Sequence, residues 1–378
     1  MPKIPSTFCP AKWDELHLNY NYNWAYGCCK ATPIVFKTSW DEELNKQKNN
    51  LLTGIQDPSC DYCWRVENQG GVSDRHGYLE QFDTDDIARY QQDISPSIVE
   101  VNLGNECNFQ CTYCGPQFSS KWETEQRTNP IRFKTDIQHY RLNIKQAENI
   151  NNNLSFLKKY TSLDTLNLIG GEPLLNKKLF KMLDELDNIK NLHITTNFSC
   201  PRRTIDAIIE RSRLYQSVRL GISLDATGAI AEFTRWGMDY NKIIDNIDYL
   251  LTNITDNIEV RILTLVSSLT IHDIDKLTEL MRKYYLRHPK LSWRLSYCVS
   301  PKIQSFNTIT DELRTRTIPK IKALTQLEYT VNANTVLDRL ENSKFDKRLY
   351  QEQQEFLIEF SQRKNIKIPE EFTNAQEQ

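Results

Sequence analysis

The amino-acid sequence predicts an α/β protein: a partial (β/α)6 barrel of the TIM type, with a small cysteine-rich module before it and a helical extension after it. Two observations support this prediction. Short β-rich runs alternate with longer amphipathic stretches between residues 97 and about 300, which is typical of βα units around a parallel sheet. Five of the ten cysteines precede residue 95. The predicted boundaries are therefore 1–95 for the module, 96–300 for the barrel and 301–378 for the extension.

The barrel zone holds six runs with the composition of buried strands. We expect strands at Ile98–Gly104, Thr165–Gly170, Leu192–Asn197, Val218–Leu224, Ile258–Val266 and Leu291–Val299. Between them, apolar residues recur every three or four positions and predict helices at about 140–160, 175–189, 203–213, 240–254 and 273–288. In a barrel of parallel strands the reactive groups belong at the C-terminal strand ends. Functional residues are expected there.

Composition and charge exclude some functions. No apolar run approaches the roughly 20 residues that cross a bilayer, so no membrane association is expected. The formal net charge is −2, because 47 basic residues are balanced by 49 acidic ones. This balance argues against a nucleic-acid partner. The N-terminal residues lack the pattern of a secretory signal, so the expected location is the cytoplasm, where cysteines are more often metal ligands than disulfides.

Three cysteines form the clearest candidate site. Cys107, Cys111 and Cys114 follow the first predicted strand directly, so all three lie on one loop at the C-terminal face. Thiolates suit Fe–S clusters, zinc and copper(I). A structural zinc site takes four protein ligands, whereas three thiolates on a [4Fe-4S] cluster leave one iron open to another molecule. The spacing therefore favours an Fe–S cluster with an open position.

Further polar and glycine residues end the next three strands. These are Gly170, Gly171, Glu172 and Pro173 at the end of the second strand, Asn197 at the end of the third, and Ser223 and Asp225 at the end of the fourth, with Arg235 ten residues beyond Asp225. Two glycines permit a ligand to approach the backbone closely, and a guanidinium group suits a carboxylate. Each also has an ordinary structural explanation as a turn, a helix cap or a surface charge. Their shared place at strand ends favours a common ligand.

The cysteine spacing C-x3-C-x2-C after the first barrel strand resembles the radical SAM superfamily. The resemblance implies that S-adenosylmethionine (SAM) binds the open iron, and that one electron from the cluster cleaves it to a 5′-deoxyadenosyl radical, which abstracts hydrogen from a substrate. It also implies an electron donor of the flavodoxin or ferredoxin type. Tyr113 matches the aromatic residue before the third cysteine. The segment Gly170–Pro173 resembles the GGEP motif that contacts the SAM amino group. Asn197 matches a Thr-Asn-Gly motif in which Phe198 replaces glycine, and Ser223, Asp225 and Arg235 resemble residues at the SAM carboxylate and ribose.

The cysteines of the N-terminal module can form a second, closed site. Cys60 and Cys63 would present two thiolates from one turn, with Cys9 and one of Cys28 and Cys29 completing four ligands. The segment is similar to the auxiliary-cluster module of twitch and SPASM radical SAM proteins, which implies a second [4Fe-4S] cluster. In those proteins the module follows the barrel, whereas here it precedes it. A structural zinc ion is the alternative.

The predicted function is that of a radical SAM enzyme that modifies a substrate by hydrogen abstraction. The resemblance favours a peptide substrate over a carbohydrate-like small molecule. The rival hypothesis is a non-catalytic zinc-binding or Fe–S scaffold that keeps the fold as an interaction surface. The two hypotheses differ in whether 5′-deoxyadenosine is formed.

Overall fold

The computed structural model describes residues 4–19, 24–35, 39–80, 82, 90, 95–131 and 154–372. Most of the helix expected at 140–160 lies outside the described residues, and the 3-10 helix η4 (Ser155–Lys159) stands at its end. By compactness the chain divides into two units. The first comprises residues 1–104 and 143–193, and the second residues 105–142 and 194–378. The division into module, barrel and extension was predicted from the sequence and stays a prediction.

The strands of the first unit are mostly short and pair on both sides of β4 (Ile98–Asn102). β4 runs parallel to β6 (Thr165–Ile169) and, on its other side, parallel to β1 (Glu15–Asn19). β2 (Trp24–Tyr26) pairs antiparallel with β1, and β3 (Ile34–Val35) pairs antiparallel with β2. β4 and β6 lie where the sequence predicts strands. The extension of the sheet by β1 was not predicted.

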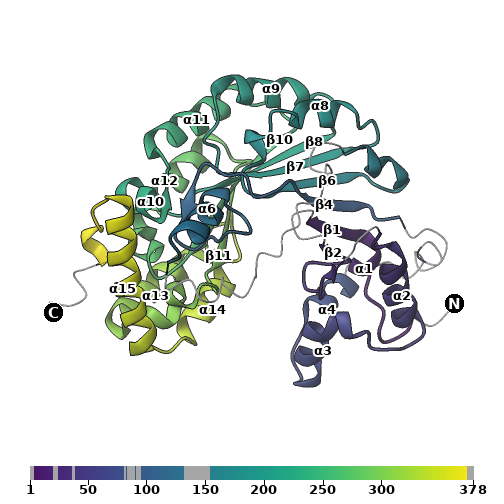
Figure 1. Cartoon of the computed structure of the whole chain (residues 1–378), viewed down its shortest axis with the longest axis horizontal. Helices are drawn as coiled ribbons and strands as arrows, with labels where there is room; N and C mark the ends of the chain where they lie inside the picture. The colour runs from purple at the N-terminus through teal and green to yellow at the C-terminus, as the bar shows by residue number, and fades with distance from the viewer. Residues whose placement is uncertain are drawn as a thin grey trace. The chain divides into compact units, whose positions relative to one another are not determined.

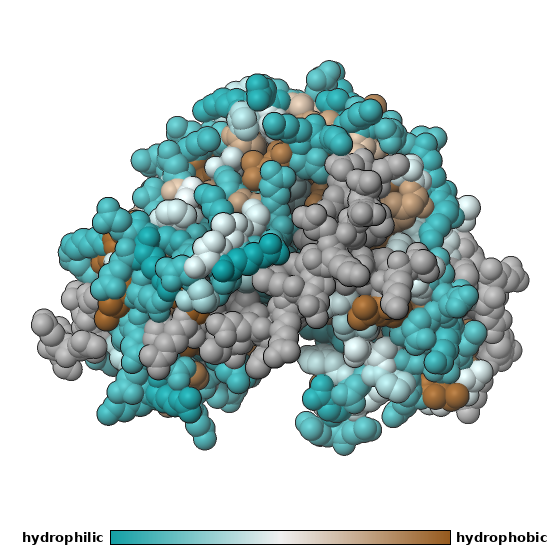
Figure 2. All heavy atoms as spheres, viewed as in Figure 1, coloured by the Kyte–Doolittle hydropathy of each residue, from teal (hydrophilic) through white to brown (hydrophobic). Residues whose placement is uncertain are grey.

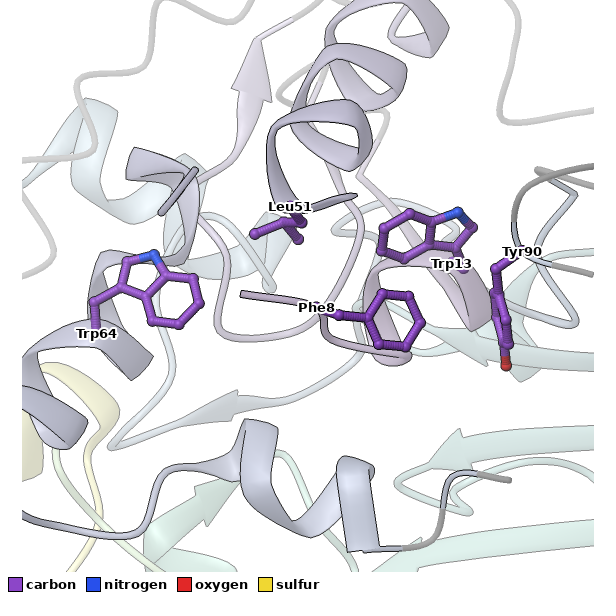
Figure 3. Packing of buried hydrophobic residues seen from close by; sticks show 5 residues of the cluster. All are labelled: Phe8, Trp13, Leu51, Trp64 and Tyr90. Atoms are coloured by element: carbon purple, nitrogen blue, oxygen red, sulfur yellow. The ribbon is translucent and has the colours of Figure 1, made fainter. Parts of the chain in front are cut away.

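The N-terminal zone has an aromatic core of its own. Its helices are α1 (Ala11–Asp14), α2 (Asp41–Leu52), η1 (Pro58–Cys60), α3 (Asp61–Asn68) and α4 (Asp74–Glu80). Figure 3 shows five buried side chains of this core, Phe8, Trp13, Leu51, Trp64 and Tyr90. The Phe8 and Trp13 ring centroids lie 5.0 Å apart. Buried aromatic area of this kind supplies several kcal/mol, so the zone does not depend on a metal alone for cohesion.

The second unit contains four parallel strands in the order β8, β10, β11, β12. Their bounds are β8 Ser217–Ser223, β10 Ile258–Val266, β11 Ser292–Tyr297 and β12 Thr330–Val331. Every second residue of β10, from Ile258 to Val266, is fully buried, while the residues between them are partly exposed. One face of these strands is therefore covered and the other stays partly open. Figure 1 shows α11 and α12 running along these strands.

The remaining elements complete the α/β pattern. They are α6 (Ser120–Thr128), η5 (Pro173–Leu175), α8 (Leu179–Asp184), β7 (Asn191–Thr196), α9 (Arg202–Ser212), α10 (Gly228–Thr234), α11 (Tyr240–Asn253), η6 (Thr270–Asp273), α12 (Ile274–Arg287), η7 (Lys302–Gln304), η8 (Phe306–Thr308), α13 (Asp311–Leu324), α14 (Ala333–Glu341), α15 (Lys347–Lys364) and η9 (Glu370–Phe372). All six predicted barrel strands are present within two residues of their expected bounds. The predicted α/β fold with a large, mostly parallel sheet is confirmed, and the C-terminal extension is helical.

The surface is polar on the face that Figure 2 shows, with apolar residues scattered among hydrophilic ones. Within the part of the chain that the structure describes, every helix is too short or too polar to span a bilayer.

His17 on β1 is expected to make stability pH-dependent. Its ring nitrogens lie 3.0 Å from Glu100 Oε1 and 2.9 Å from Glu15 Oε2. Burial alone would lower its pKa, but the hydrogen bonds to Glu100 and Glu15 outweigh it and raise the pKa to about 9. The ordinary value of about 6.5 applies in the unfolded chain. The stabilisation is therefore complete below about pH 6.5 and is lost as the pH rises through 9.

Urea unfolding of the wild type and of His17→Gln at pH 6.5, 7.5 and 9 checks this expectation. The free energy of unfolding of the wild type should exceed that of the variant most at pH 6.5, and the difference should shrink toward pH 9. A difference that stays constant over this range would contradict the charged form of His17. Other titrating groups affect both proteins equally and cancel.

Candidate functional site

The cysteine loop, residues 105–119, is attached to a second segment by a small antiparallel sheet. β5 (Gln110–Cys111) pairs with β9 (Arg235–Trp236), with Cys111 opposite Arg235. The Thr112 N–H donates to the Thr234 carbonyl at 2.7 Å. Gly237 continues β9 with φ +99°, and a Cβ atom there would lie 2.9 Å from the Asn108 carbonyl oxygen. Only glycine permits this approach, so the middle of the loop has a fixed backbone position.

Helix α6 holds the other side of the cysteine loop. The Ser119 hydroxyl donates to the Phe109 carbonyl at 2.8 Å and caps α6 by accepting from the Trp122 N–H. The Trp122 indole N–H donates to the Cys111 carbonyl at 2.8 Å. Trp122 is completely buried. The Phe109 and Cys111 carbonyl groups are thus bonded to protein side chains, and these contacts hold the loop without a ligand.

The surroundings of Cys107 suit a cluster ligand, because hydrogen-bond donors point at its sulfur. The Phe109 N–H points at Cys107 Sγ at 3.4 Å, and Asn197 Nδ2 lies 3.9 Å from the same sulfur. Hydrogen bonds to sulfur are a normal support of cluster thiolates. Cys111 is buried, while Cys107 and Cys114 are half-buried. In the described residues, no three Cys, His, Asp or Glu side chains form a group arranged to hold a metal ion.

Tyr113, Asp225 and Arg235 form one buried network. Tyr113 Oη donates to Asp225 Oδ2 at 2.5 Å, and Arg235 Nη1 donates to the same oxygen at 2.9 Å. Asp225 Oδ1 accepts from the Leu265 N–H at 2.8 Å. Burial would lower the pKa of Arg235, but the charges of Tyr113, Cys111 and Asp225 raise it well above its usual value. Arg235 therefore stays charged beside Cys111.

The network changes what Arg235 is expected to do. The resemblance implies a contact with SAM, yet Arg235 Nη1 is engaged by Asp225 and, at 2.5 Å, by the Tyr113 hydroxyl. Its Nε is buried without a hydrogen-bond partner among the described residues. Ser223, two residues before Asp225, is half-buried at the end of β8. The structure thus brings Tyr113, Asp225 and Arg235 together, and the contact of each with SAM stays a prediction.

Asn197 lies against the cysteine loop. Its Nδ2 donates to Asn108 Oδ1 at 2.8 Å, and its Oδ1 accepts from the Ser199 N–H at 2.9 Å. Phe198, which replaces the glycine of the resembled motif, has φ +58°. This left-handed conformation costs a residue with a side chain about 1–2 kcal/mol, and the complete burial of the Phe198 ring offsets it. The backbone therefore has the shape that a glycine would favour.

The segment Gly170–Pro173 belongs to the first unit. Gly170 has φ +142°, and a Cβ atom there would lie 2.8 Å from the Gly104 carbonyl oxygen. The Gly171 N–H donates to that same oxygen at 2.7 Å. Glu172 is buried, and its Oε1 accepts from the Leu174 N–H at 3.0 Å as the cap of η5. The two glycines thus permit close contact with the end of β4.

The five N-terminal cysteines influence one another electrostatically, Cys29 through its effect on Cys28. Burial raises the pKa of the Cys9 thiol to about 12, and negative charge at Cys28, Cys60 and Cys63 adds to this rise. Cys29 is exposed. Partial burial raises the pKa of its thiol, and the negative charge of Glu15 raises it further. Cys60 immediately precedes α3, which carries Cys63. Cys28, Cys60 and Cys63 are therefore close enough to Cys9 for their charges to act on it.

Lys364, at the end of α15, contacts the cysteine loop and was not predicted from the sequence. Its ammonium group donates to Gln110 Oε1 at 2.7 Å, pairs with Glu125 of α6 and lies 4.7 Å from the Trp236 ring centroid. Its side chain is 7% exposed. No motif marks this lysine, which lies more than 250 residues from Gln110. Contacts of this kind follow only from the tertiary fold.

Replacing Lys364 by methionine should lower the free energy of unfolding by about 2 kcal/mol, because Glu125 and Gln110 lose a partly buried charged partner. Urea unfolding of the protein without metal measures this change. Lys367→Met is the matched control, since Lys367 is 82% exposed and pairs only with exposed Glu370. Equal effects of the two substitutions would contradict a special role for Lys364.

Parts of the chain are similar in sequence to known proteins. Residues 101–281 match the family model described as the Radical SAM superfamily. GTP 3',8-cyclase of Nautilia profundicola is 33% identical over 102 residues, which cover 26% of this chain and 27% of that protein. GTP 3',8-cyclase of Staphylococcus epidermidis is 24% identical over 163 residues, covering 41% and 42%. The matched stretch thus spans less than half the length of either curated relative.

A solved structure is also similar in part. Streptococcus suis SuiB bound to S-adenosylmethionine aligns with a TM-score of 0.38 and 13% identity, over 76% of this chain and 64% of that one. The family model covers the cysteine loop, the Gly170–Pro173 segment, Asn197 and the buried network of Tyr113, Asp225 and Arg235. The family implies a [4Fe-4S] cluster and SAM as cofactors. Residues 101–281, with the three-cysteine loop among them, are therefore similar to the radical SAM superfamily.

Proposed function

We propose that the protein cleaves SAM reductively and uses the product radical to abstract hydrogen from a substrate. The observation that carries this proposal is the C-x3-C-x2-C loop within the family match, with its backbone held by β9 and α6. A [4Fe-4S] cluster bound there would supply one electron, received from a donor of the flavodoxin or ferredoxin type, to break a sulfur–carbon bond of SAM. The products are methionine and a 5′-deoxyadenosyl radical, which becomes 5′-deoxyadenosine when it takes hydrogen.

The chain's own residues have distinct parts in this proposal. Cys107, Cys111 and Cys114 would hold the cluster through their thiolates, and the cluster would supply the electron for SAM cleavage. The Phe109 N–H and the Asn197 side-chain amide direct hydrogen-bond donors at Cys107 Sγ. Asp225 and Arg235 hold the Tyr113 ring in place through its hydroxyl group. Ser223, Glu172 and the two glycines of Gly170–Pro173 remain proposed contacts of SAM.

The first experiment uses the full chain reconstituted without oxygen. Iron and sulfide are counted, dithionite and SAM are added, and 5′-deoxyadenosine is quantified. We expect nucleoside formation that requires reductant. Metal binding without nucleoside under any reducing condition would overturn the enzyme proposal and support the non-catalytic scaffold.

We also propose an auxiliary [4Fe-4S] site at Cys9, Cys28, Cys60 and Cys63. The charges of Cys28, Cys60 and Cys63 act on Cys9, and Cys29 is exposed, which supports this set over one with Cys29. The buried Lys12 ammonium donates to Ser59 Oγ at 3.0 Å, and Ser59 Oγ lies 3.8 Å from Cys60 Sγ. A cation beside four thiolates would offset part of their charge.

Metal content separates the auxiliary site from the first one. The wild type should bind about eight irons, at four per cubane, and Cys60→Ala with Cys63→Ala should remove about four. Cys29→Ala is the matched control and should retain all of them. One zinc ion in place of four irons would overturn the auxiliary cluster in favour of a structural zinc site.

The relatives' names point to a second class of substrate beside a peptide. Both are called GTP 3',8-cyclase, so a nucleotide is a candidate substrate here as well. Incubation with guanosine triphosphate, or with peptides, in the presence of SAM and reductant distinguishes the two. Turnover of either substrate is read as a product peak by mass spectrometry.

A further inference from the structure

Three arginines lie on the open face of the parallel strands in the second unit. They are Arg219 of β8, Arg261 of β10 and Arg294 of β11, which we call the arginine patch. In each strand the flanking residues, such as Ile262 and Leu295, are buried on the other face. Arg219 and Arg261 are half-buried and Arg294 is exposed. Because side chains alternate along a strand, all three point to the same side of the sheet.

The strand register places the three guanidinium groups diagonally across the sheet. Arg219 is opposite Glu259, two residues before Arg261. Arg261 is opposite Ser292, two residues before Arg294. Adjacent strands lie about 4.8 Å apart and each step also advances two residues of about 3.3 Å, so the diagonal spans roughly 16 Å. Two hydrogen bonds orient it: Arg219 Nε to Glu259 Oε2 at 2.9 Å and Arg261 Nε to Ser292 Oγ at 3.2 Å.

The patch carries excess positive charge. Among the residues of β8, β10 and β11 whose side chains point to this face, Glu259 is the acidic one. Three guanidinium groups therefore face one carboxylate. Among the described residues, neither Arg261 nor Arg294 has a carboxylate within 4.0 Å. Burial lowers the pKa of Arg261, and repulsion from Arg219 and Arg294 lowers it further. A bound anion would relieve this repulsion.

The patch lies on the same face as the end of β8 that precedes Asp225. Ser223 is four residues beyond Arg219 on the same strand, so both side chains point to the same side. At about 3.3 Å per residue the two positions are roughly 13 Å apart along the strand. Arg294 and Ser223 both pair with Leu263, so the Arg294 end of the patch is level with Ser223. A small molecule held at the patch would therefore reach Ser223, beside Asp225 and its partner Tyr113.

We propose that the arginine patch binds the phosphate groups of a small-molecule substrate of this protein. The description of the ligand as a substrate rests on the proposed function, whereas phosphate binding itself does not. A carboxylate presents two oxygens in one plane and fits one guanidinium fork. A polyphosphate presents oxygens in several directions and can engage guanidinium groups that come from three strands. The width of the patch and its charge therefore favour phosphates.

The test measures binding of inorganic pyrophosphate to the full chain without iron or SAM, by calorimetry at about 50 mM salt, where surface charge is little screened. Arg294→Gln and Arg261→Gln should each weaken binding at least 10-fold. Arg294→Lys should recover part of the affinity, because it keeps the charge but loses the fork. Arg348→Gln on α15 is the matched control, since Arg348 is 87% exposed and its loss changes the net charge equally.

The result that overturns the proposal is a lack of pyrophosphate binding, or an equal loss of binding in Arg348→Gln. If citrate binds as tightly as pyrophosphate, the patch recognises carboxylate groups and not phosphate groups specifically. Exposed Arg294 can be replaced without disturbing the core, so the test does not depend on the folding of Arg261→Gln. Because SAM cleavage is not measured, failure here leaves the 5′-deoxyadenosine experiment unaffected, and failure of that experiment leaves phosphate binding intact.

Discussion

Replacing Cys111 by alanine is expected to reduce 5′-deoxyadenosine formation to background while the chain stays folded. The loop would retain two thiolates, Cys107 and Cys114, and the proposed cluster needs three from this loop. Cys111 is held in β5 by backbone hydrogen bonds, and its carbonyl accepts from Trp122, so alanine preserves these contacts. The loss of one buried sulfur costs about 1 kcal/mol of stability. The effect should therefore fall on chemistry and not on folding.

The measurement compares iron content, nucleoside yield and urea unfolding of the two proteins. The variant should lose about four irons and all nucleoside, with unfolding shifted little. Cys200→Ala is the matched control, because Cys200 is also buried but lies outside both proposed ligand sets. It should keep its iron and its activity. Nucleoside formation by Cys111→Ala at the wild-type level would rule out the loop as the cluster site.

Replacing Asp225 by asparagine is expected to lower the free energy of unfolding by about 3–5 kcal/mol, which is typical when one partner of a buried ion pair is removed. Asp225 is 2% exposed and accepts hydrogen bonds from Tyr113, Arg235 and the Leu265 N–H. Asparagine keeps one acceptor oxygen but removes the charge. The guanidinium group of Arg235 would then be buried without a countercharge. Tyr113, next to Cys114, would lose its acceptor as well.

A double-mutant cycle tests this explanation. Arg235→Met removes the buried charge, so the pair of substitutions should cost at least about 2 kcal/mol less than the sum of the two single ones. Asp206→Asn is the matched control, because Asp206 accepts a hydrogen bond from Tyr249 at the exposed surface and its loss should cost less than about 1 kcal/mol. Additive costs for Asp225 and Arg235 would show that the ion pair is not the source of the effect.

Local patterns in the sequence predicted most elements of the barrel zone. β10 spans Ile258–Val266 as predicted, because its alternation of buried and partly exposed residues is an intrinsic property of a strand in a sheet. The helix α11 likewise follows from its regular apolar positions. The cysteine spacing and the Asn197–Phe198 turn are also local. Phe198 adopts the conformation of the glycine that it replaces, so the backbone requirement at this position outweighs residue preference.

Contacts between distant segments did not follow from these patterns. β1 joins β4 across about 80 residues, and β9 pairs with the cysteine loop from about 120 residues away. Both strands are five residues or fewer, and so short a run has no distinctive period. The N-terminal ligand set and the roles of the SAM-contact residues stay predictions. Their proof depends on the experiments proposed above.

The sequence by itself determined the α/β fold class, the order of the barrel strands and the three thiols on one loop, because each depends on residues close together in the chain. Tertiary structure alone decided that Arg235 is paired with Asp225 and Tyr113, that Lys364 holds the cysteine loop, and that Arg219, Arg261 and Arg294 share one face. The physical reason is that these contacts depend on the register between segments that are distant in the sequence. Which side chains meet across strands and helices depends on how distant segments align, and no local period encodes that alignment.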